Sequence, residues 1–163
     1  MGSIFGAIER LVEAIGKGGA FLILPATALA LMEVVLRYLF SAPTTWSNEI
    51  GQYLFSGIFL LCAAYTLQVD GHVRVDIVHQ YVPPIVRSIL LLIAYPVIAF
   101  HLGIFLWVTG ERAIEAVSFF ERLQSVWAPY VWPIYLLIPF SALLMLLQLV
   151  CSLARELGRL RKA

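Results

Sequence analysis

A long uncharged run near the middle of the chain constrains the fold more than any other stretch. Ile50–Val69 contains 20 residues without a formal charge. An α-helix of about 20 apolar residues crosses the roughly 30 Å hydrocarbon core of a membrane. Polar and aromatic residues flank the run at both ends: Trp46 and Glu49 before it, and Asp70, His72, Arg74 and Asp76 after it. The sequence therefore predicts a membrane-crossing helix that is anchored by a polar cluster at each face.

The composition agrees with an integral membrane protein. Of the 163 residues, 61% are hydrophobic and 13% are charged, whereas a soluble domain contains about 25% charged residues. The formal net charge is +1, so the charge balance does not indicate a nucleic-acid partner. Cys62 and Cys151 lack the spacing of a metal site or a redox motif, and we interpret them as small apolar residues.

Residues 3–17 have the pattern of an amphipathic helix, with apolar residues on one face and charged residues on the other. We expect this arm to lie in the membrane interface, its apolar face toward lipid or a partner. The alternative is a helical extension of the first span. Gly16, Gly18 and Gly19 argue against that alternative, because glycines weaken a helix.

Three further apolar runs complete a four-span pattern. We expect the spans at about 19–40, 48–69, 86–110 and 129–153. Residues 111–124 are polar enough to form a loop or a short surface helix. Pro83 and Pro84 separate the second span from the third, since a proline cannot continue a helix. The predicted fold is an all-α integral membrane four-helix bundle, a single domain over 1–163 with an N-terminal amphipathic interfacial helix.

Lys and Arg orient this bundle. Four spans put both termini on one side, and cytoplasmic loops carry an excess of Lys and Arg. With both termini inside, eight of the eleven Lys and Arg residues lie inside, and Arg37, Arg112 and Arg122 lie outside. We therefore predict an N-in, C-in topology in which residues 41–48 and 111–128 face out.

Ionisable residues within the predicted spans need partners, because charges at that depth are costly and normally face protein. At 1.5 Å per residue, Glu33 and His101 both lie about 21 Å from the inner face, so they could pair. Arg37 lies one turn further out, near Glu49 at the outer start of the second span. Arg37 and Glu49 are therefore a second candidate pair. We interpret both pairs as structural ties, because no chain of ionisable groups crosses the bilayer.

Several chemistries lack their sequence signals. There is no Walker loop, dinucleotide glycine pattern or HExxH motif. A haem between helices needs histidines on facing spans, and only the third predicted span contains one, His101. Transporters that act alone commonly contain internal repeats, and we see none. An accessory membrane subunit, neither an enzyme nor a cofactor carrier, fits better than two alternatives: a cofactor-carrying membrane anchor of an oxidoreductase, or a free-standing small transporter.

The residues around the central helix resemble those of a known family. RYLF at 37–40, Trp46 and Glu49 precede the helix, and GHVRVD at 71–76 follows it. A further pattern opens the last span: Pro129, Trp132, Tyr135 and Pro139. Together they resemble the small membrane subunit of TRAP transporters, the DctQ-type proteins of tripartite ATP-independent periplasmic uptake systems.

The resemblance implies a place in a three-part system of the bacterial inner membrane. The small subunit pairs with a large membrane subunit, which carries the substrate and Na⁺ sites and moves as an elevator. A periplasmic substrate-binding protein delivers an organic acid. The small subunit is a fixed scaffold that transport needs but that binds no Na⁺ itself. The choice of substrate resides in the other two components.

Nine residues are candidate structural or interface positions: Glu33, Arg37, Trp46, Glu49, Gly71, His72, Arg74, Asp76 and His101. The Arg74–Asp76 region has two interpretations, an inner-face turn tied by its own salt bridges or a docking point for the large subunit or anionic phospholipids. His72 fits a hydrogen-bonded structural role better than that of a ligand. Small and aromatic residues are candidates for close helix packing with the partner: Gly57, Ala63, Ala64, Gly103 and Trp107.

Overall fold

Four helical segments are long and apolar enough to cross a membrane. The computed structural model describes the backbone of residues 2–69 and 84–160. The spans are Phe5–Leu39, Ser47–Gln68, Ile93–Ser118 and Trp132–Arg155. The described residues contain no β-strand, only an isolated antiparallel bridge between Arg122 and Tyr130. The predicted all-α, four-span fold is confirmed, whereas the predicted positions at 71–76 lie outside the described residues.

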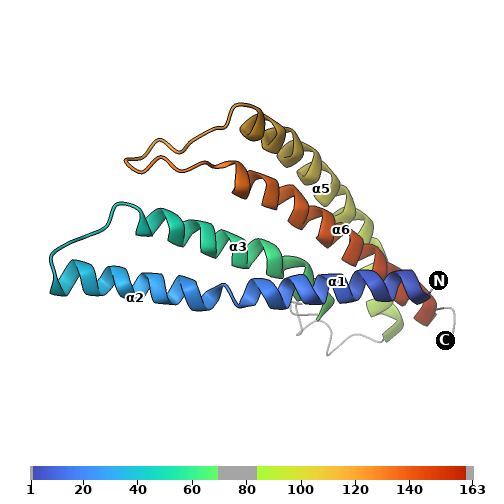
Figure 1. Ribbon diagram of the computed structural model, residues 1–163. Helices are drawn as coiled ribbons and strands as arrows, with labels where there is room; N and C mark the ends of the chain where they lie inside the picture. Colours follow the sequence, from blue (N-terminus) through green and yellow to red (C-terminus); the bar gives the residue numbers. More distant parts are fainter. Residues whose placement is uncertain (1, 70–83, 161–163) are drawn as a thin grey trace.

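The described helices form two layers around a central pair. They are α1 (Gly2–Ala20), α2 (Ile23–Leu39), α3 (Ser47–Gln68), α5 (Pro84–Ser118) and α6 (Trp132–Leu160). Figure 1 shows α3 and α6 in the middle, with α1 and α2 along the outer side of α3 and α5 along the outer side of α6. Both termini lie at one end of the bundle, the terminal end (Figure 1). The connections at 40–46 and 119–131 lie at the opposite end, the loop end.

The N-terminal arm differs in one respect from the predicted interfacial helix. α1 runs almost in line with α2, and only a turn at Phe21 and Leu22 separates them (Figure 1). The apolar face of α1 packs against α3 and α6. Val12 is buried there beside Ala64 and Leu144. The structure therefore corrects one part of our expectation: the apolar face of the arm is covered by this chain's own helices and not by lipid or a partner. The position of the arm relative to the membrane interface stays a prediction.

Two of the three glycines that seemed to weaken the helix have a packing role. A Cβ atom added to Gly16 would overlap the Cβ of Tyr65, and one added to Gly19 would lie 2.6 Å from the Cβ of Leu61. Glycine therefore allows α1 and α3 to approach closely, as small residues do in membrane helix pairs. The low helix propensity of glycine, about 1 kcal/mol relative to Ala, is offset by this contact.

The third span is longer than predicted. The segment 111–118, expected to be a loop or a short surface helix, forms the last two turns of α5. Its charged residues end the apolar segment but not the helix, because Glu and Arg are good helix formers. The 35-residue α5 is about 52 Å long, which exceeds the roughly 30 Å hydrocarbon core. The second span, in contrast, agrees with the prediction to within one residue at each end.

The central pair is joined by packing and by a hydrogen bond. The Ser141 hydroxyl of α6 donates to the Leu60 carbonyl of α3 at 2.6 Å. On the other side of α6, Leu149 packs with Tyr95 and Leu102 of α5. The residues proposed for contact with the partner fall into a buried group and an exposed group. Gly57 and Ala64 are buried inside the chain, whereas Gly103 and Trp107 are exposed on α5.

The close approach of α1 and α3 predicts opposite effects for two neighbouring glycines. Gly16→Ala should destabilise the protein by about 1–3 kcal/mol, because the added methyl group must push α1 away from Tyr65. Gly18→Ala should be neutral or stabilising, since nothing lies within 4 Å of its added Cβ. Unfolding in mixed detergent micelles, followed by helical circular dichroism, measures both variants. Equal effects of the two substitutions would contradict the packing role.

Candidate functional site

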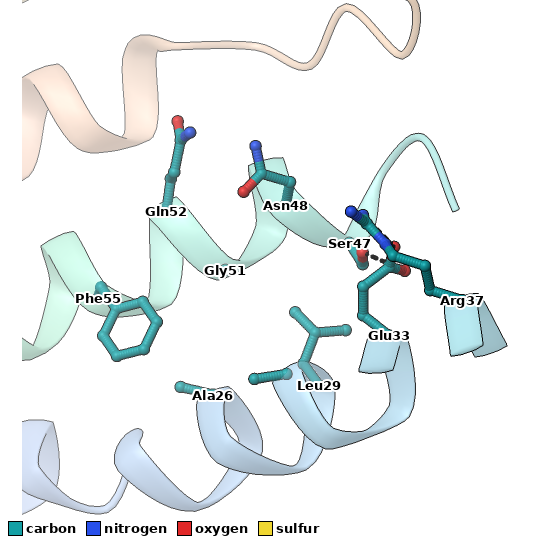
Figure 2. Close-up of a pocket in the computed structure, with 10 residues that line it drawn as sticks. Ala26, Leu29, Glu33, Arg37, Ser47, Asn48, Gly51, Gln52 and Phe55 are labelled. Atoms are coloured by element: carbon teal, nitrogen blue, oxygen red, sulfur yellow. Dashed lines mark hydrogen bonds and ion pairs between the residues drawn. The ribbon is translucent and has the colours of Figure 1, made fainter. Parts of the chain in front are cut away.

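Glu33 is the centre of a polar network at the loop end of the bundle (Figure 2). Its Oε2 accepts hydrogen bonds from the Ser47 hydroxyl at 2.7 Å, the Thr44 hydroxyl at 2.6 Å and the Thr44 backbone N–H at 3.3 Å. Its Oε1 accepts from Arg37 Nε at 3.2 Å and Nη2 at 2.7 Å. One carboxylate thus ties α2 to the following connection and to the first residue of α3.

Local sequence brings these donors together. Arg37 follows Glu33 by four residues, so both side chains lie on the same face of α2. Ser41 then adopts a left-handed backbone with φ of 50°, and the chain turns back toward Thr44. Ser47 is only 3% exposed. The Glu33–Ser47 contact is thereby shielded from water and electrostatically stronger than the same contact on an open surface, whereas Arg37 lies on the exposed side of the network.

The two charge pairs predicted by counting depth are wrong. Arg37 forms its ion pair with Glu33 on its own helix at 2.7 Å, and the structure shows no ion pair between Arg37 and Glu49. Glu33 does not pair with His101, which is exposed on α5. The reason is geometric, because depth along the membrane does not give the direction of a side chain. α2 packs on α3 and α5 packs on α6, so Glu33 and His101 lie in opposite outer layers.

Glu49 is separate from this network. It is 8% exposed in the first turn of α3, and its Oε2 is buried without a hydrogen-bond partner among the described residues. Tyr53, one turn further on, donates its hydroxyl to the Tyr130 carbonyl at 2.6 Å. That bond ties α3 to the connection between α5 and α6. Trp46, half-buried, immediately precedes the helix.

The connection between α5 and α6 is held by two arginines that sequence reasoning left unassigned. Arg112 binds both carboxylate oxygens of Glu121, at 2.8 and 2.7 Å, and its guanidinium lies 5.0 Å from the centre of the Tyr135 ring. The Arg122 guanidinium lies 4.2 Å from the centre of the Tyr130 ring. Such cation–π contacts add to the ion pair. Tyr130 and Tyr135, near the start of the last span, therefore help to order this connection.

The terminal end has a tie of its own. Arg155 of α6 forms an ion pair with Glu9 of α1 at 3.2 Å. The Gln68 side-chain amide of α3 donates to the Glu9 backbone carbonyl at 3.2 Å. Among the side chains that the structure describes, no three His, Cys, Asp or Glu residues are placed to hold a metal ion. The interactions found at both ends therefore connect helices of this chain to one another.

The fold and its polar groups identify the class of protein. The chain is a multi-pass α-helical membrane protein whose charged side chains tie its own helices together. The residue pattern of one family, described as tripartite ATP-independent periplasmic transporters, DctQ component, matches residues 26–159. This match covers most of the chain, which belongs to the DctQ family of TRAP transporter components. The family resemblance drawn from the sequence is thereby confirmed. No curated protein matches the chain in a direct sequence comparison.

The network predicts which residues are energetically coupled. Glu33→Gln and Ser47→Ala should each destabilise the fold, and the double variant should lose less than the sum, because both remove the same tie. Arg37→Ala and Glu49→Ala should instead be additive, since the two side chains share no contact. Thermal unfolding of the four single and two double variants in one detergent measures both cycles. Additivity in the first cycle, or coupling in the second, would contradict the geometry.

Proposed function

We propose that this chain is the fixed scaffold of a Na⁺-coupled, binding-protein-dependent transporter that takes up organic acids across the bacterial inner membrane. A large membrane subunit carries the substrate and Na⁺ sites and moves, while a periplasmic binding protein delivers the substrate. The match to the DctQ component family carries this proposal. The geometry supports it in two ways.

The first support is the way in which the helices are fixed. A stationary subunit has to hold its helices in place while its partner moves. Ties occur at three levels of this bundle: Glu33 joins α2 to the start of α3, Ser141 joins α6 to the middle of α3, and Arg155 joins α6 to α1. The charged groups of these ties are engaged within the chain.

The second support is an exposed surface on α5. Phe100, Gly103, Ile104, Trp107 and Val108 line a shallow apolar hollow of about 420 Å³. A glycine between larger apolar residues lets a second helix approach closely. We assign this surface, named here the α5 hollow, to contact with the large membrane subunit.

The proposed orientation follows from charge and shape together. Both termini lie at one end and two connections at the other (Figure 1), as an even number of spans requires. The predicted excess of Lys and Arg at the terminal end places that end in the cytoplasm. The loop end, with the Glu33 network and the ordered α5–α6 connection, then faces the periplasm.

Reconstitution tests the scaffold role. The large subunit and binding protein should transport poorly in liposomes without this chain, and adding the chain should restore uptake. The number of Na⁺ ions per substrate should stay constant in the Glu33→Gln and Glu49→Gln variants, because the scaffold handles no ions. A changed stoichiometry in either variant would contradict the proposal.

A matched pair of glycines tests the α5 hollow. Gly103→Leu should reduce co-purification of the large subunit, because the new side chain fills the surface that the partner helix needs. Gly110→Leu is the control, since an added Cβ meets nothing within 4 Å at either position and both glycines lie in α5. Equal recovery of the large subunit with both variants would exclude this surface as the contact.

A further inference from the structure

The contact between α3 and the first two helices is closed along most of its length and opens near the loop end. At the closed part, a Cβ atom on Gly57 would lie 3.2 Å from Cδ1 of Leu22. Two turns nearer the loop end, an added Cβ on Gly51 would meet nothing within 4 Å. The Glu33–Ser47 hydrogen bond closes the contact again at the loop end. Gly51 is therefore not explained by close helix packing.

A crevice of about 270 Å³ occupies this opening. Its apolar walls come from α2 and α3: Ala26, Leu29, Ala30, Gly51 and Phe55. Figure 2 shows Leu29 rising from α2 toward α3 and Ala26 near Phe55, while Gln52 and Asn48 point from α3 away from α2. The end nearest the loop is polar and is formed by Glu33, Arg37 and Ser47. The crevice is thus lined by apolar residues along its length, with the polar Asn48 and Gln52 on its α3 side, and is charged at one end.

The length of the crevice fits an extended hydrocarbon chain. From Ala26 to Arg37 the rise along α2 is about 17 Å at 1.5 Å per residue. That length is close to half of the roughly 30 Å hydrocarbon core, which is the depth of one leaflet.

The charged end offers hydrogen-bond donors to an anion. The Arg37 side chain is 54% exposed, although Glu33 accepts from its Nε and Nη2 atoms. A guanidinium carries five N–H donors, so the remaining N–H groups of Arg37 are available on the open side. Phosphate oxygens are preferred acceptors for such donors. Glu33 competes little with a phosphate for the remaining N–H donors of Arg37, since its two oxygens already accept five hydrogen bonds.

We propose that the crevice binds one acyl chain of a glycerophospholipid from the leaflet at the loop end, with the lipid phosphodiester held by Arg37. The acyl chain fills the space beside Gly51 that neither helix occupies. The lipid then completes the contact between α2 and α3. The Glu33 tie holds α2 at the loop end, and the bound lipid holds it along the crevice. The proposal concerns the isolated chain and does not rest on its role in transport.

Native mass spectrometry of the full-length chain tests this site. The protein is stripped of lipid in detergent and titrated with dioleoylphosphatidylglycerol. We expect one lipid to bind well before the others, and Gly51→Leu to weaken this first step at least fivefold by filling the crevice. Gly110→Leu, the same change in an open position on α5, should bind like the wild type. Equal affinities for the two variants would overturn the proposal.

A second comparison tests the headgroup contact. Wild-type protein should prefer dioleoylphosphatidylglycerol to dioleoylglycerol, which lacks the phosphate, and Arg37→Gln should lose that preference. Free glycerol 3-phosphate should not displace the lipid. Displacement at equal concentration would show that the site binds only the headgroup, and the acyl-chain proposal would be wrong. If Gly51→Leu lowers the helical circular dichroism, Ala30→Leu replaces it, because Ala30 lines the crevice from an exposed position.

The remaining occupant to exclude is a side chain of the partner subunit. If Gly51→Leu binds lipid normally but no longer recovers the large subunit on co-purification, a protein side chain fills the crevice and the lipid proposal is wrong. If lipid binding falls while recovery of the large subunit in added phospholipid is retained, the lipid proposal holds.

Discussion

Apolar side chains gain little by leaving lipid for another helix, so a fixed helix arrangement in a membrane depends on close backbone contact and on hydrogen bonds. In this chain both kinds of contact lie along α3. Gly16 and Gly19 bring α1 close to it, and the Ser141 hydroxyl bonds to its backbone from α6. The remaining helices are positioned from there, α2 through Glu33 and α5 through its packing on α6. This arrangement supports the proposed stationary role.

The charged groups that form the ties have a consistent use. Glu33 satisfies donors from three consecutive parts of the chain, and Arg155 meets Glu9 at the opposite end. Because the ends are tied and the middle is packed through small residues, the helix arrangement is held without a large buried core. A gap in this arrangement is the space beside Gly51, and a bound lipid would close it without adding a protein contact.

Hydrophobic patterning predicted the number of spans and the limits of the second span, because these depend on composition along the chain alone. The family was predicted from residue motifs around the central helix and at the start of the last span. The direction of side chains around each helix was not predictable in this way. Glu33 and Arg37 were each expected to pair with a residue of another helix, yet they pair with each other within about one turn of α2. Counting residues along a helix gives the depth of a residue in the membrane, but it does not give the direction in which its side chain points.

Glycines and charges were ambiguous for related reasons. Gly16 and Gly19 suggested a helix break because propensity is a local property, whereas the structure uses them for contact with residues about 45 positions away. Glu111 and Arg112 suggested the end of a helix, but they mark only where α5 leaves the hydrophobic zone. The predicted roles of Gly71, His72, Arg74 and Asp76 concern a segment outside the described residues and stay predictions.

The scaffold account is tested most directly by distances within the chain during transport. Spin labels at Tyr38→Cys on α2 and Ile114→Cys on α5, both exposed positions, are introduced after replacement of Cys62 and Cys151 by alanine. Double electron–electron resonance on the assembled transporter then compares the apo state with the Na⁺- and substrate-loaded state. We predict an unchanged distance distribution within this chain, while the distance from Tyr38→Cys to a label on the substrate-carrying part of the large subunit shifts. A shift within this chain on adding Na⁺ and substrate would contradict the account.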